Sequence, residues 1–201
     1  MRNIVVMALV SILILAGVIW AGGRQAPQTG DNQNGISPTP ETEVLDGWRE
    51  YQDEEIGIRI NHPPEMEVNE VGQEEGMVSK GVNFTLVGPS QAPATEFFDG
   101  ISLRFSRIGS RGQTTKDFAQ QQLDDLRNSP VFESGDQKVA PIVINNYQGF
   151  EYEVQTITPI RYIYLPAGEN EVLEIVDLTR DPTGAGFEAI RDRILSDLVL
   201  M

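Results

Sequence analysis

The sequence predicts an α+β fold, with one mostly antiparallel sheet and helices packed on its faces. Many short segments alternate apolar and polar residues, which is typical of strands with one buried face. Two other segments repeat apolar residues every three or four positions, as the buried side of a helix does. The chain order is strands, helix, strands, helix, and this order favours helices lying on an antiparallel sheet.

The predicted strands are short and end at turn residues. Those of the first half cover residues 56–61, 67–71, 82–86 and 101–105, and an acidic turn is expected at 72–76. The first strand ends at His62 because Pro63 and Pro64 cannot continue a ladder of hydrogen bonds. The second half predicts hairpins over 142–154 and 160–178 and a closing strand over 198–200. Asn145 and Asn146 form the first hairpin turn, because asparagine tolerates positive φ.

Two helices are predicted from apolar stripes and capping residues. The first covers 115–127, and Thr114 followed by Asp117 resembles a capping box at its start. The second is expected to start at Asp181 as the cap, with Pro182 in the first helical position. Its apolar stripe consists of Phe187, Ile190, Ile194 and Leu198.

Residues 1–23 have the composition of a membrane segment. An uncharged, apolar run extends from Ile4 to Trp20, and with the small residues after it reaches about 30 Å as a helix. A signal anchor is favoured because this run is longer than the apolar part of most signal peptides. A signal peptide cleaved after Ala21 or Gly23 stays open as the alternative. Either way, the rest of the chain faces away from the cytoplasm.

Residues 24–46 predict a disordered linker, and residues 47–201 predict a single extracytoplasmic domain. The linker is rich in Pro, Gly, Asn, Gln and Thr and has almost no aliphatic residues. It therefore cannot bury enough apolar surface to offset the entropy lost on ordering.

Charge and cysteine content exclude several function classes. The formal net charge is −15, which argues against nucleic acid and anionic lipid head groups as partners. We interpret this charge as a source of solubility, with a cationic partner or loosely held divalent ions as alternatives. Cysteine is absent, so disulfides, thiolate zinc sites and cysteine nucleophiles are excluded.

The residues with chemical potential are scattered. His62 is the only histidine and cannot form a zinc site alone, and Ser110 lies in a turn rather than a nucleophile elbow. Acidic residues cluster at 53–55, at Glu65 with Glu67, and at 74–75. We interpret these acids as a solvated surface, with weak calcium binding or glycosidic hydrolysis as alternatives.

Other sequence features are weaker still. Gly184 and Gly186 lack the rest of a phosphate-loop pattern, and the glycosylation sequon at Asn83 falls in a predicted strand. Trp48 and Tyr51 are expected to fasten the N-terminal edge of the domain. The remaining tyrosines are expected in core and strand positions, with an exposed docking edge as the alternative: Tyr147, Tyr152, Tyr162 and Tyr164.

Four features of residues 48–201 occur together. The chain has Trp48-x-x-Tyr51, followed by Gly57 and Pro63 within the segment 56–63. This resembles the opening motif of the PsbP-like domain family, W-x-x-Y followed by G-[FI]-x-[IV]-x-[YH]-P. The central helix, the hairpin at 142–150 and the closing helix complete the likeness, although Asn146 stands where the family has glycine. The chain is more similar to bacterial membrane-anchored members than to the chloroplast extrinsic subunit of photosystem II. The resemblance implies an α-β-α sandwich and a non-enzymatic binding or assembly role.

We therefore expect a membrane-tethered, extracytoplasmic binding or assembly module that is not an enzyme. It would be a single-pass protein of the cell membrane, or secreted if residues 1–23 are cleaved, with a protein partner. No catalytic, cofactor-binding or metal-binding residues and no cofactor are predicted. A hydrolase using the clustered carboxylates and a passive envelope component are the alternatives.

Overall fold

The computed structural model describes residues 47–71, 80–91, 98–129, 136–156 and 158–201. The predicted membrane segment, the linker and the acidic turn at 72–76 lie outside these residues. Neither of the two helices described is long and apolar enough to cross a membrane.

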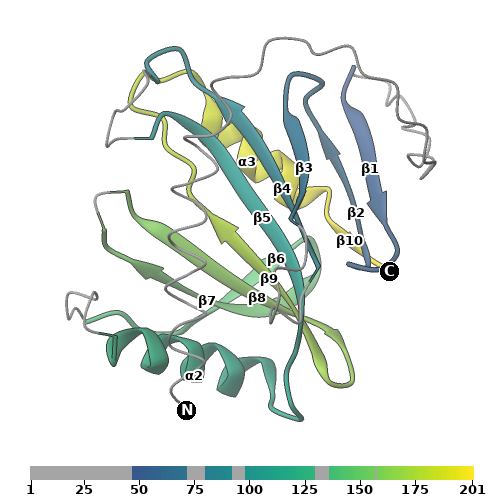
Figure 1. Ribbon diagram of the computed structural model, residues 1–201, viewed down its shortest axis with the longest axis vertical. Coiled ribbons are helices and arrows are strands. Elements are labelled where there is room, and N and C mark those ends of the chain that lie inside the picture. Colours follow the sequence, from purple (N-terminus) through teal and green to yellow (C-terminus); the bar gives the residue numbers. More distant parts are fainter. Residues whose placement is uncertain (1–46, 72–79, 92–97, 130–135, 157) are drawn as a thin grey trace, which may run out of the picture.

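The larger sheet has seven strands in the order β3-β4-β5-β9-β8-β7-β6, all paired antiparallel (Figure 1). The strands are β3 (Glu67–Val71), β4 (Gly81–Val87), β5 (Gly100–Gly109), β6 (Ala140–Ile144), β7 (Tyr147–Val154), β8 (Ile160–Gly168) and β9 (Glu171–Asp177). A smaller antiparallel sheet has the order β1-β2-β10, with β1 (Arg49–Asp53), β2 (Ile58–His62) and β10 (Val199–Leu200).

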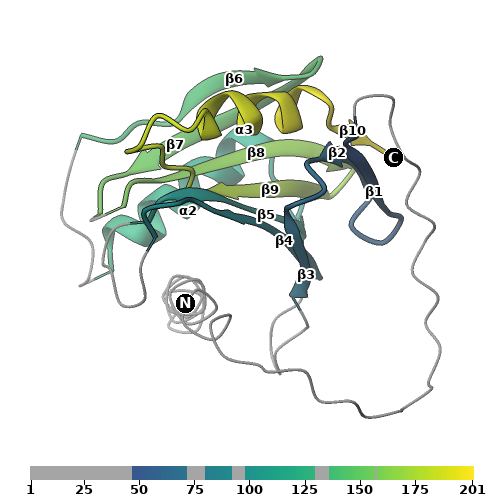
Figure 2. The same ribbon diagram turned by 90° about the horizontal axis from the view of Figure 1, so that it is seen from above.

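Two helices pack on opposite faces of the larger sheet (Figure 2). Helix α2 (Thr115–Arg127) has the predicted bounds, and the Thr114 hydroxyl accepts a hydrogen bond from the Asp117 N–H, as a cap should. Helix α3 (Phe187–Ser196) starts later than predicted, with Gly186 as its N-cap. The carboxylate of Asp181 still accepts the N–H groups of Gly186 and Phe187, so it caps α3 from a preceding loop.

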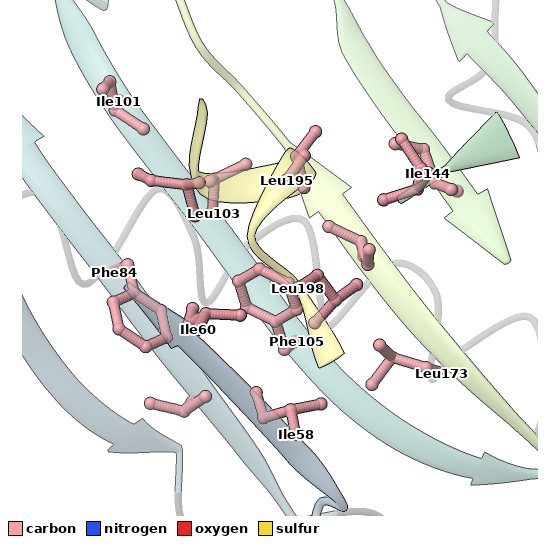
Figure 3. Packing of buried hydrophobic residues seen from close by; sticks show 14 of the residues in the cluster. Ile58, Ile60, Phe84, Ile101, Leu103, Phe105, Ile144, Leu173, Leu195 and Leu198 are labelled. Atoms are coloured by element: carbon pink, nitrogen blue, oxygen red, sulfur yellow. The ribbon is translucent and has the colours of Figure 1, made fainter. Parts of the chain in front are cut away.

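The prediction of an α+β sandwich was wrong, because the fold is mostly β. Strands hold 48% of the described residues and helices only 17%. The physical reason is that one face of the larger sheet is not covered by a helix alone. A second sheet shares this role with α3, and Ile58 and Ile60 of β2 reach the core beside Phe84 and Phe105 (Figure 3). Sequence periodicity identified β2 as a strand but could not show that it belongs to a separate sheet.

Each face of the larger sheet has its own apolar core. The core beneath α3 and the small sheet is the larger, and its fully buried side chains include Phe84, Phe105 and Leu173. The opposite core lies under α2, where Phe118 and Leu123 of the helix meet strands β7, β8 and β9. These two cores hold the seven-stranded sheet between them and leave its outermost strands, β3 and β6, as edges.

The turn between β6 and β7 is the two-residue hairpin that the sequence predicts. Asn145 and Asn146 have φ of 46° and 74°, which identifies a type I′ turn despite the missing glycine. The Asn145 side-chain amide donates to the Leu198 carbonyl, and the Tyr147 hydroxyl accepts the Leu200 N–H. The segment 198–200 therefore fixes the position of this hairpin.

Candidate functional site

The described residues contain no group of three or more metal-ligating side chains that could hold an ion. His62 is buried, its ring packs against Phe84, and its Nδ1 lies 2.9 Å from the Pro63 carbonyl oxygen. These contacts give His62 a structural position at the end of β2. Ser110 is also buried, and its N–H donates to the carbonyl of Asn170, which lies in the β8–β9 turn.

The acidic cluster at 53–55 builds a turn rather than a reaction centre. The Asp53 carboxylate accepts the N–H groups of Glu55 and Ile56 and lies 3.2 Å from the Lys80 ammonium. Burial alone would raise the pKa of Asp53, but these hydrogen bonds and Lys80 outweigh it and lower that pKa. Glu65 and Glu67 are exposed, and the acids at 74–75 lie outside the described residues.

Three tyrosines lie under α2, so the alternative of a tyrosine docking edge is wrong for them. Tyr152, Tyr162 and Tyr164 are at most 8% exposed, and Tyr152 stacks on Tyr162. The Tyr164 hydroxyl is 3.1 Å from that of Tyr152 and donates to the Glu174 carboxylate, which also pairs with Arg104. Burial is the main cause that raises the pKa of all three phenols. The network gives the Tyr152 and Tyr164 hydroxyls and the Glu174 carboxylate partners within the core.

The remaining sequence features have structural roles. Asn83 is 5% exposed and donates to the Thr85 hydroxyl, so the sequon is inaccessible in the folded domain. The Arg193 guanidinium covers the Trp48 ring at 4.1 Å, and Tyr51 packs its edge against Phe84. The expected role of Trp48 and Tyr51 in fastening the N-terminal edge agrees with these contacts.

The edge position of β6 is the feature that sequence reasoning missed, although the strand itself was predicted as the first arm of the hairpin over 142–154. Strand β6 is an edge of the larger sheet, and none of its five residues is charged. Val143 is 64% exposed, the largest value among the exposed large hydrophobic residues of the described chain. We call the side of Ala140–Ile144 that faces away from β7 the β6 edge.

The other strand edges of the described sheets are protected. Strand β3, at the opposite end of the larger sheet, exposes the carboxylates of Glu67 and Glu70. In the small sheet, β1 carries Arg49, Glu50 and Asp53, and β10 is only two residues long. Charges, proline and short length are usual devices that prevent strands from pairing with other chains. The β6 edge has no charged side chain, and Pro141 is the one such device on it.

A hollow of about 580 Å³ lies beside this edge, between the start of α2 and the surface of β6 and β7. Its lining comprises Thr114, Thr115, Lys116, Pro141, Ile142, Val143, Gln148, Gly149 and Phe150. Pro141, Val143 and Phe150 point to the α2 side of the sheet, because side chains alternate along a strand and paired residues share a face. No carboxylate is among these described lining residues, so the hollow offers no acid pair for hydrolysis.

The register of β6 shows which backbone groups it presents outward. The pair Ile144–Tyr147 closes the type I′ turn and exchanges hydrogen bonds, and bonded and non-bonded pairs alternate from there. Val143 and Pro141 therefore fall in non-bonded pairs, and their backbone polar groups point away from β7. Proline has no N–H, so its place here is consistent with an outward-facing edge position. The β6 edge consequently offers one N–H, that of Val143, and the carbonyls of Val143 and Pro141.

Comparison with models of known protein families finds no match, and comparison with curated proteins finds none either. The likeness to PsbP-like domains therefore stays a prediction. The β6 edge and the hollow beside it are the best candidate site because of their geometry alone.

Proposed function

We propose that this protein is a non-catalytic binding module, held at the extracytoplasmic face of a membrane by residues 1–23 and docking a protein partner at the β6 edge. The observation that carries this proposal is the uncharged, exposed edge strand around Val143. An edge of this kind exposes unpaired backbone groups and apolar side chains together, which is the surface that another polypeptide can pair with.

Site-specific photo-crosslinking in intact cells tests the docking role. A photoreactive residue replaces Val143 in one variant and Val87 in the control, because Val87 is also an exposed strand valine, at 57%. Val87 lies at the end of β4, beyond the last residue that pairs with β3, and β4 is remote from β6 in the strand order. We expect one discrete crosslinked product from position 143 and none from position 87. Equal products from both positions, or none from position 143, would contradict the proposal.

Labelling of an introduced cysteine tests the location. The chain has no cysteine, so Glu169→Cys provides a single thiol in the exposed β8–β9 turn. A membrane-impermeant maleimide should label this thiol in intact cells, or in spheroplasts if an outer barrier blocks the reagent. Labelling only after lysis of the inner membrane would place the domain in the cytoplasm and refute this part of the proposal.

A further inference from the structure

We infer that the β6 edge binds by strand addition. The occupant is an extended, uncharged segment with apolar residues at alternate positions, belonging to a partner protein of net positive charge. This inference rests on the proposed docking function and specifies what docks. It predicts that the partner segment becomes an eighth strand of the larger sheet, beside β6.

The backbone of the β6 edge selects an extended segment over a helix. A partner residue opposite Val143 can accept its N–H and donate to its carbonyl, which forms a closely spaced pair of hydrogen bonds. Two residues further along, the partner donates an N–H to the Pro141 carbonyl, and its own carbonyl accepts no hydrogen bond there because proline has no N–H. A helix cannot make these bonds, because its own backbone groups are already paired internally.

The hollow beside β6 selects the side chains. A strand added to β6 continues its pleat, so alternate partner side chains point to the α2 side of the sheet. There they meet the apolar surface of Pro141, Val143 and Phe150. Partner residues at these positions are therefore apolar. A charged side chain there would lose its hydration, and Lys116 is the one charged side chain among the described lining residues of the hollow.

The charge of the chain selects the kind of protein that carries the segment. Two copies of this chain would each bring a net charge of −15, so self-pairing at β6 is opposed by repulsion. Self-pairing centred on Val143 would also set Pro141 opposite Asn145, which is in the left-handed turn and not in extended conformation. A positively charged partner meets neither obstacle and is attracted by the field of the whole domain.

Three synthetic peptides serve as probes for the full chain in detergent micelles. The first is acetyl-Lys-Val-Thr-Val-Thr-Val-Lys-amide, which is extended, alternating and cationic at its ends. The second has proline in place of all three valines, which removes the backbone donors that would face β6 while the side chains there stay apolar, and the third has glutamate in place of both lysines. We expect binding in the order first, third, second. Binding of the proline peptide as tight as that of the first would overturn the strand-addition mode.

Two protein variants test the backbone contact directly. Val143→Pro removes the outward N–H but no hydrogen bond to β7, whereas Val143→Thr keeps both the N–H and the side-chain shape. We expect Val143→Pro to weaken binding of the first peptide about tenfold and Val143→Thr to change it less than about threefold. Circular dichroism checks that both variants fold. Equal affinities of these two variants would refute the inference.

Pro141→Ala provides a test in which peptide binding is expected to become tighter rather than weaker. Alanine restores an outward N–H to the β6 edge, and the expected result is tighter binding of the first peptide. Unchanged or weaker binding by a folded Pro141→Ala variant would count against the ladder. If Val143→Pro fails to fold, this variant still decides the question.

Amide hydrogen exchange and crosslinking separate the other occupants. The Val143 N–H should exchange fast in the free full chain and become protected when the peptide binds. Protection without peptide would mean that another segment of this chain covers the β6 edge, and a crosslink between two Val143 positions would mean a second copy; either overturns the inference. A further outcome is that a partner is captured through position 143 but neither the peptides nor the variants show the expected differences in binding. This result would support the docking function and refute only strand addition. No captured partner would instead contradict the docking function itself.

Discussion

At the scale of single residues, the tyrosines under α2 link burial to the pH dependence of stability. Burial raises the pKa of Tyr152, Tyr162 and Tyr164 in the folded chain above the usual value near 10. Their contribution to stability is therefore fully present below pH 10, where folded and unfolded chains are both protonated. It is lost as the pH rises above 10, because only the unfolded chain then releases these protons.

We predict that tyrosine ionisation and unfolding coincide for these residues. Absorbance near 295 nm reports tyrosinate, and circular dichroism reports the fold, so both are measured across one alkaline titration. Part of the tyrosinate absorbance should appear only in the transition that abolishes the circular dichroism signal. Tyr162→Phe should raise the midpoint pH of alkaline unfolding, because one raised pKa is removed. Complete tyrosine ionisation near pH 10 in a chain that stays folded would contradict the prediction.

At the scale of elements, the turn between β6 and β7 positions the candidate site. Asn146 adopts φ of 74°, and among the described residues its side chain bonds to that of the neighbouring Asn145. We predict that Asn146→Ala lowers the free energy of unfolding by about 1 kcal/mol, because alanine tolerates the left-handed region poorly. Asn146→Gly should change it by less than about 0.5 kcal/mol, since glycine adopts positive φ readily but loses entropy on folding.

Urea denaturation of the two Asn146 variants measures this difference. Asn146→Gly is the control because it removes the same side chain without the backbone penalty. Equal losses in both variants would show that the side-chain contact with Asn145, and not the backbone conformation, stabilises the turn.

The elements that could be predicted are those whose evidence is local. The period of apolar residues located β2 and α2, and Asn145-Asn146 located the hairpin turn, because each depends only on neighbours in sequence. Strand β1 was not predicted, since its residues do not alternate between apolar and polar. The predicted start of α3 was too early, because Asp181 caps this helix across a loop. The fold class failed for a non-local reason, namely that β2 pairs with β1 and β10 in a second sheet.

The candidate site could not be predicted because it depends on strand order. Ile142, Val143 and Ile144 are three apolar residues in a row, and such a run usually indicates a strand buried on both faces. Only the order of the larger sheet shows that β6 has one neighbour. Pro141 carried the available signal, since proline in a strand indicates an edge position.

At the scale of the whole molecule, charge and contact act at different stages of binding. The net charge of −15 extends over the entire chain, whereas the β6 edge itself carries no charged side chain. Long-range attraction governs how often a cationic partner meets the domain, and the short-range ladder and apolar contacts govern how long it stays.

This separation predicts how salt affects the two rate constants. Between low salt and about 0.15 M, the Debye length falls to about 8 Å and the field of the domain is screened. We expect the association rate constant of the lysine-flanked peptide to fall several-fold over this range, while its dissociation rate constant changes little. Surface plasmon resonance of the full chain in detergent measures both constants. For the glutamate-flanked peptide the sign reverses, because screening removes repulsion and association becomes faster as salt increases. An association rate that ignores salt for both peptides would show that the net charge has no part in selecting the partner.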